Sequence, residues 1–115
     1  MRFAHVMLRV KDLDKSIDFY TNILGMSVQK KADNPEYKYT LVFLGYGDIS
    51  SHTVLELTYN WDDYKYDHGN AFGHLCMQVD DVYKACEDVK AKGGSTVIAF
   101  IKDPDGYQIE LIEKA

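Results

Sequence analysis

The sequence predicts an α+β protein made of two copies of a βαβββ module. An ungapped internal repeat aligns residues 3–25 with residues 72–94, and such repeats define the architecture of a chain. Each copy begins with an alternating segment typical of a strand and continues with apolar residues at helical spacing. Two β-rich segments around a turn then close each copy. A length of 115 residues allows one domain or two small modules, and the repeat favours two modules.

The first strand of each copy has two different faces. His5 and its aligned counterpart His74 lie on a mixed face, whereas the opposite face is apolar. We expect the apolar face to pack on a helix and the histidine face to look into a polar space. His52 and His68 lie in turns and have no repeat partner, so we interpret them as solvated.

A helix is predicted after each first strand. Asp12 and Asp81 are suitable N-caps, and Gly25 and the pair at 93–94 stand where a left-handed C-terminal residue is favoured. The apolar residues at helical spacing are Leu13, Ile17, Tyr20 and Leu24 in the first copy, and Val82, Ala85, Cys86 and Val89 in the second.

The remaining strands differ in number between the two copies. They are predicted at 27–31, 40–45 and 53–60 in the first copy, and at 97–101 and 107–113 in the second. The second copy is therefore predicted to lack its second strand, between Gly94 and Ser95. Either a strand and a loop have been lost, or residues are missing from the sequence here. We favour missing residues, because a helix running directly into the next strand would leave a gap in the sheet.

The predicted organisation is a first module at 1–60, a linker at 61–70 and a second module at 71–115. The linker WDDYKYDHGN is polar and rich in turn-forming residues.

Composition excludes several classes of function. A net charge of −5 disfavours nucleic-acid binding, which needs clustered basic residues. No apolar stretch reaches the roughly 20 residues needed to span a bilayer, and the N-terminus lacks a signal-peptide cleavage site. Two cysteines are too few for a disulfide framework and are interpreted as reduced thiols. We therefore expect a cytoplasmic protein with no nucleic-acid or membrane partner.

Two carboxylates lie inside strongly apolar strand patterns. A lone glutamate such as Glu56 or Glu110 is more often found on a solvated face. In both copies, however, a histidine on the first strand is matched by a glutamate near the middle of the last. Together with His5 and His74 these residues form a quasi-symmetric set of four candidate ligands. Imidazole and carboxylate together favour a divalent transition metal, and four ligands on a six-coordinate ion leave open positions, which is typical of a catalytic site.

The sequence closely resembles the glyoxalase I (lactoylglutathione lyase) enzymes of the vicinal-oxygen-chelate superfamily, in particular their short bacterial forms. The resemblance covers essentially the whole chain, through HVMLRVKDLDKSIDFYTNILGM, VLELTYNW, FGHLCMQVDDVYKACE and DPDGYQIELIE. It implies paired βαβββ modules that form curved mixed sheets. The metal ligands of the family fall on His5, Glu56, His74 and Glu110. The resemblance also implies one divalent metal per site, with nickel favoured and cobalt or zinc as alternatives.

The implied reaction isomerises the hemithioacetal of methylglyoxal and glutathione to S-lactoylglutathione. In this family the glutamate on the last strand is the usual base, which implies that Glu110 is the base and Glu56 its counterpart. Arg9 and Asn60 match family contacts to the glutathione carboxylates. A further family arginine is replaced here by Asn70, so that contact is not expected.

Family members are homodimers with the active site at the dimer interface. The implied site joins His5 and Glu56 of one subunit with His74 and Glu110 of the other. Two alternatives stay open: another metal-dependent enzyme of the superfamily, or a small-molecule-binding module. Extradiol dioxygenases and fosfomycin-modifying transferases typically use only one glutamate, and metal-free binding modules lack the ligand set.

Overall fold

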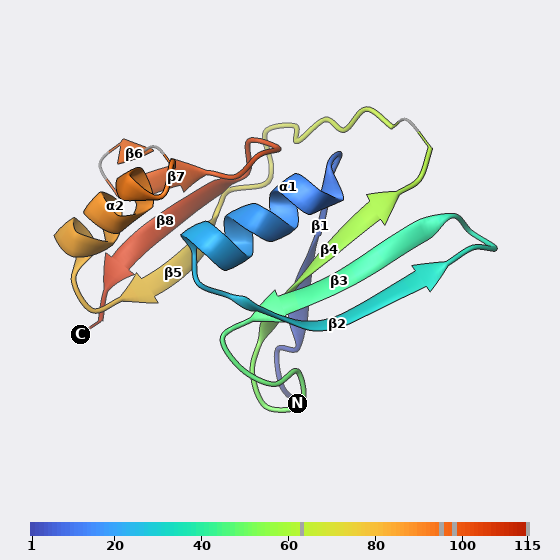
Figure 1. The fold of residues 1–115 in the computed structure, drawn as a ribbon, viewed down its shortest axis with the longest axis horizontal. Coiled ribbons are helices and arrows are strands. Elements are labelled where there is room, and N and C mark those ends of the chain that lie inside the picture. Colours follow the sequence, from blue (N-terminus) through green and yellow to red (C-terminus); the bar gives the residue numbers. More distant parts are fainter. Residues whose placement is uncertain (63, 95, 98, 115) are drawn as a thin grey trace. The chain divides into compact units, whose positions relative to one another are not determined.

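The chain forms two four-stranded sheets (Figure 1). The computed structural model describes all residues except 63, 95, 98 and 115. The chain divides into two compact units, Met1–Tyr66 and Asp67–Ala115, and this boundary falls within the segment predicted as a linker. Each unit has the element order βαβββ, which confirms the predicted α+β class.

The first unit contains a mixed sheet with the strand order β1-β4-β3-β2. Its strands are β1 (His5–Arg9), β2 (Ser27–Asn34), β3 (Tyr39–Gly45) and β4 (Val54–Asn60). The first and last strands pair in parallel, because a helix and a hairpin separate them in the chain, and the other pairs are antiparallel. The prediction located all four strands, but β2 extends beyond its predicted end at residue 31.

The second unit repeats this topology with the order β5-β8-β7-β6. Its strands are β5 (Leu75–Val79), β6 (Thr96–Val97), β7 (Phe100–Lys102) and β8 (Gln108–Glu113). Two predictions were wrong here. The segment 97–101 is not one strand, and the second strand is not missing, because β6 pairs antiparallel with β7. The two-residue β6 therefore occupies the second strand's place in this sheet.

Both helices begin at the predicted caps, and the first continues into a π-helical segment. The Asp12 side chain accepts a hydrogen bond from the Lys15 backbone N–H at the start of α1 (Leu13–Asp18). The Asp81 side chain does the same for Lys84 at the start of α2 (Val82–Ala91). α1 continues into a π-helical segment, Phe19–Ile23. Among the described residues, no helix has the length and apolar character needed to cross a membrane.

Glycines end both helical segments in the left-handed conformation. Gly25 has a φ of 74° and Gly93 a φ of 96°, a conformation that L side chains rarely adopt. After α2, the Gly94 N–H donates to the Val89 carbonyl at 2.9 Å, which is the pattern of a left-handed helix cap.

The core of each unit lies between its helix and one face of its sheet. The buried strand residues on this face are Leu8, Val42, Leu44, Leu55 and Leu57 in the first unit, and Ile101, Ile109 and Leu111 in the second. Cys86 and Val89 are buried from α2 as predicted. In the first unit the adjacent Phe19 and Tyr20 are both buried, whereas the prediction assigned only Tyr20 to the core. The wider π turn directs two consecutive aromatic side chains inward.

A buried aspartate fixes the turn before β8. Asp103 is 5% exposed, and its Oδ1 accepts hydrogen bonds from the backbone N–H groups of Asp105 and Tyr107, both at 2.9 Å. We expect Asp103→Ala to lower the free energy of unfolding by about 1–3 kcal/mol, because two backbone donors lose their acceptor. Asp103→Asn keeps an acceptor oxygen and should recover most of this loss. Chemical denaturation of the full chain measures both, and equal losses in the two variants would contradict this role.

Candidate active site

The first histidine–glutamate pair lies on neighbouring parallel strands. Met7 of β1 stands opposite Glu56 of β4, which places His5 two residues away on the same face. The His5 Nε2 lies 3.3 Å from Glu56 Oε1. Phe43, opposite Glu56 on β3, meets the imidazole edge-on, with ring centroids 5.5 Å apart. This aromatic contact restricts the orientation of the His5 ring.

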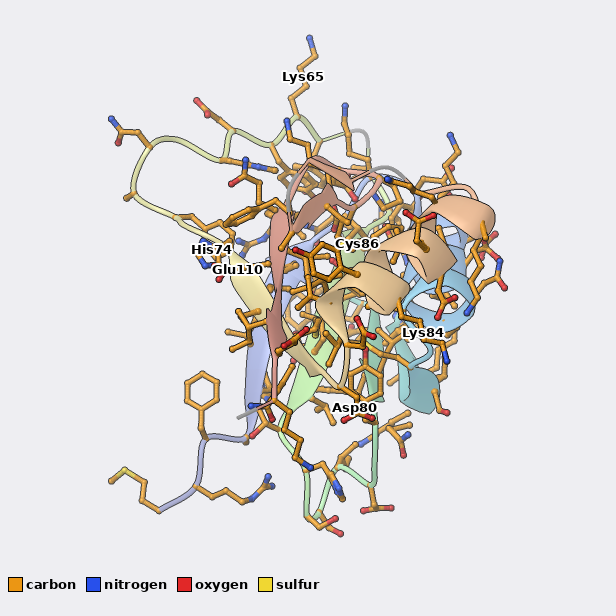
Figure 2. The ribbon with its side chains drawn as sticks, turned by 90° about the vertical axis from the view of Figure 1, so that its left-hand side faces the viewer. Lys65, His74, Asp80, Lys84, Cys86 and Glu110 are labelled. Carbon is orange, nitrogen blue, oxygen red and sulfur yellow. The ribbon has the colours of Figure 1, made fainter. Side chains whose placement is uncertain are left out.

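The second pair reproduces this arrangement in the second unit. Cys76 of β5 stands opposite Glu110 of β8, and His74 immediately precedes β5. His74 Nε2 lies 2.9 Å from Glu110 Oε2, and Phe100 meets the imidazole edge-on at 5.3 Å. Figure 2 shows His74 and Glu110 side by side, on the side of their sheet away from α2. The two units that repeat in sequence therefore also have the same arrangement of histidine, glutamate and phenylalanine.

Both pairs have the chemistry and spacing of metal ligands. Two ligands at about 2.1 Å from a six-coordinate ion, in neighbouring positions, lie roughly 3.0 Å apart. The observed nitrogen–oxygen distances of 3.3 and 2.9 Å bracket this value. Within the part of the chain that the structure describes, no group of three or more His, Cys, Asp or Glu side chains is placed to hold a metal ion. Each unit therefore offers two donors.

The surroundings of the two glutamates differ. The Thr58 hydroxyl donates to Glu56 Oε2 at 3.0 Å, and the Glu56 side chain is 13% exposed. The Glu110 side chain is 30% exposed, and the residue two positions after it is Ile112, which has no donor. Sequence reasoning did not single out Thr58. Its position two residues after Glu56, on the same strand face, was the available signal.

A cysteine lies beside the second pair. Cys76 stands opposite Glu110 on the histidine face of the second unit. Partial desolvation of the sulfur, followed by the negative charge of Glu110, raises the pKa of the Cys76 thiol. A nucleophilic thiolate at Cys76 is therefore disfavoured next to the glutamate.

Asn60, a predicted substrate contact, lines a pocket of about 180 Å³ in the first unit. The pocket lies where β1 and β4 end, and its lining residues are Val10, Lys11, Tyr59, Asn60, Trp61, Asp62, Tyr64 and Tyr66. The Asn60 amide donates to the Tyr66 hydroxyl at 2.9 Å, so these two side chains are joined within the pocket lining. Tyr66 was missed because it lies in the predicted linker.

The other predicted contact, Arg9, lies on the histidine face of the first unit. It ends β1, opposite Thr58, and is two strand positions further along than Met7. Asn70, which replaces the family arginine, lies exposed in a turn of the second unit.

The two remaining histidines have different environments. His52 is exposed, as predicted, and its Nδ1 lies 2.8 Å from the Ser51 hydroxyl. The prediction for His68 was wrong, because its ring stacks on that of Tyr107, with centroids 4.1 Å apart and planes at 10°. An aromatic neighbour distant in sequence gave no local signal for this contact.

Comparison with known proteins identifies the family. Residues 2–111 match the model of the Glyoxalase/Bleomycin resistance protein/Dioxygenase superfamily. The chain belongs to this family.

Several individual proteins are similar to this chain over nearly its whole length. A probable lactoylglutathione lyase of Vibrio cholerae is 56% identical over 124 residues, covering 97% of this chain and 90% of that protein. A lactoylglutathione lyase of Neisseria meningitidis is 54% identical, covering 99% and 91% of the two chains. Among solved structures, the trypanothione-dependent glyoxalase I of Leishmania major superposes with a TM-score of 0.90 at 48% identity, covering 98% of this chain and 86% of that one.

Proposed function

We propose that this chain is a lactoylglutathione lyase that converts the hemithioacetal of methylglyoxal and glutathione into S-lactoylglutathione, and so detoxifies methylglyoxal. The observation that carries this proposal is the pair of equivalent His–Glu contacts, at 3.3 and 2.9 Å, in two repeated units. The names of the Vibrio and Neisseria relatives support it at 54–56% identity. Their greater similarity favours glutathione over trypanothione, the thiol named for the Leishmania enzyme at 48% identity.

The proposed metal site consists of His5, Glu56, His74 and Glu110. Two neutral imidazoles and two carboxylates suit a divalent transition ion, and we favour nickel, with cobalt and zinc as alternatives. An ion bound there would act as a Lewis acid that stabilises the negative charge developing on the substrate oxygens. Phe43 and Phe100 would hold the two imidazoles in place, since each meets one of the rings edge-on.

Glu110 is the proposed general base. Its carboxylate would take the proton from C1 of the hemithioacetal and return a proton to C2, while the hydroxyl proton moves between the two oxygens, so that the reaction is a net isomerisation. A base must be able to move between ligand and substrate, and Glu110 is the more exposed of the two glutamates. Glu56 is the proposed fixed counterpart. Arg9 and Asn60 are proposed to bind the carboxylates of glutathione, where a guanidinium and an amide are suitable partners.

We further propose a homodimer in which His5 and Glu56 of one subunit meet His74 and Glu110 of the other. Two observations support this assembly. Each unit has only two of the four donors, and in each unit both donors lie on the sheet face opposite the buried core residues. The proposed compartment is the cytoplasm, and Cys76 and Cys86, which form no disulfide, are compatible with a reducing environment.

Metal removal and replacement test the proposed function. We expect the chelator-treated protein to be inactive toward the hemithioacetal, because no Lewis acid remains, and added nickel to restore thioester formation more fully than zinc. Ultraviolet absorbance of the thioester measures both. Absence of activity with nickel, cobalt and zinc would overturn the proposal and favour a binding module.

A further inference from the structure

A hydroxyl group is one difference between the two His–Glu pairs. In the first unit Thr58 follows Glu56 by two residues, and in the second Ile112 follows Glu110 by two residues. We propose that Thr58 is a positioning residue that holds Glu56 as a fixed metal ligand, and that the lack of a donor at position 112 leaves Glu110 free to move. This inference rests on the proposed metal site.

The geometry around Glu56 gives both carboxylate oxygens a partner. Oε1 lies 3.3 Å from His5 Nε2, and Oε2 accepts the Thr58 hydroxyl hydrogen at 3.0 Å. Thr58 is only 8% exposed, because it lies within the sheet between Arg9 of β1 and Leu41 of β3. Its hydroxyl therefore has little access to solvent, and the carboxylate is its partner.

Glu110 has no matching donor at the equivalent place. Its Oε2 lies 2.9 Å from His74 Nε2, but the neighbouring side chain on the same face is the aliphatic Ile112, which is 40% exposed. A carboxylate held at both oxygens keeps one orientation, whereas a carboxylate held at one oxygen rotates more easily. The repeat thus places a glutamate at the equivalent position of each unit. The residue two positions later, Thr58 or Ile112, determines whether that glutamate is held as a fixed ligand or is able to move.

Hydrogen bonds to ligating side chains raise metal affinity, and their loss typically weakens it by about 10–100-fold. We expect Thr58→Val, which keeps the shape but removes the hydroxyl, to raise the dissociation constant for nickel by about tenfold. Thr58→Ser keeps the hydroxyl and should bind nickel as the wild type does. Calorimetric titration of the metal-free dimer measures the affinities, and the visible spectrum of the cobalt forms should change in the valine variant only.

The reciprocal variant tests the second half of the proposal. Ile112→Thr places a hydroxyl beside Glu110, and we expect a lower kcat with undiminished nickel affinity, because the carboxylate is held back from the substrate. Thr58→Val and Ile112→Thr both introduce residues that are favourable in strands. Thermal unfolding of the metal-free variants verifies that they fold.

Three outcomes would overturn the inference. They are unchanged nickel affinity in Thr58→Val, an equal loss of affinity in Thr58→Ser, and unchanged kcat in Ile112→Thr. Failure of the wild-type protein to bind any of the ions would instead overturn the proposed metal site, so the two failures are distinguishable.

Discussion

Glu110→Gln is expected to lower kcat by about 10²–10⁴-fold, the usual contribution of a general base, while the protein still binds its metal ion. The amide cannot take the C1 proton, but its carbonyl oxygen can still act as a ligand beside His74. Thioester formation measures kcat, and elemental analysis measures the bound metal. Turnover near the wild-type level would contradict the assignment of Glu110 as the base.

A matched control lies on the same strand. Glu113 alternates to the opposite face of β8 from Glu110, and its carboxylate accepts from the Val82 backbone N–H at 3.2 Å. Glu113→Gln makes the same chemical change and keeps an acceptor for that N–H. Its turnover should equal that of the wild type, because Glu113 faces away from the proposed site.

Mixing two inactive variants should restore activity if each site is shared between subunits. His5→Ala removes a ligand from the first unit, and His74→Ala removes one from the second, so each homodimer lacks complete sites. In a mixed dimer both lesions fall in one site and the other site is complete. Random reassortment makes about half of the dimers mixed, each with one complete site of two, so we expect about a quarter of the wild-type activity.

The control mixture combines two lesions in the same unit. His5→Ala mixed with Glu56→Gln leaves every shared site damaged, so no activity should appear. Co-unfolding and refolding of differently tagged chains provides the mixed dimers. If the His5→Ala and His74→Ala mixture stayed inactive after verified reassortment, each site would lie within one chain and the proposed dimer would be wrong.

The repeat made much of the fold and the four candidate ligands predictable. Because His5 aligns with His74 in the repeat, the first strands of the two units also align. Glu56 pairs with the residue two positions after His5, and Glu110 pairs with the residue two positions after His74. Alternation then identified the histidine face in each unit. These features depend on local periodicity, which sequence expresses directly.

Other features depend on contacts or geometry that periodicity does not encode. β6 was missed because two paired residues, 96 and 97, carry no strand pattern of their own. The π-helical segment at 19–23 keeps ordinary helical spacing in sequence, so nothing distinguished it from α-helix. The Thr58 donor and the stacking of His68 on Tyr107 depend on side-chain orientation, which only the structure shows.

Nickel titration of three metal-free proteins tests most directly whether the two His–Glu pairs form one metal site. The proteins are the wild type, His5→Ala and His74→Ala. A shared site predicts that each single substitution weakens the tight binding by more than about 100-fold, since losing a ligand costs more than losing a hydrogen bond to one. Retention of the wild-type affinity in either variant, or loss of only half of the bound metal, would show that the pairs act separately and would contradict the shared site.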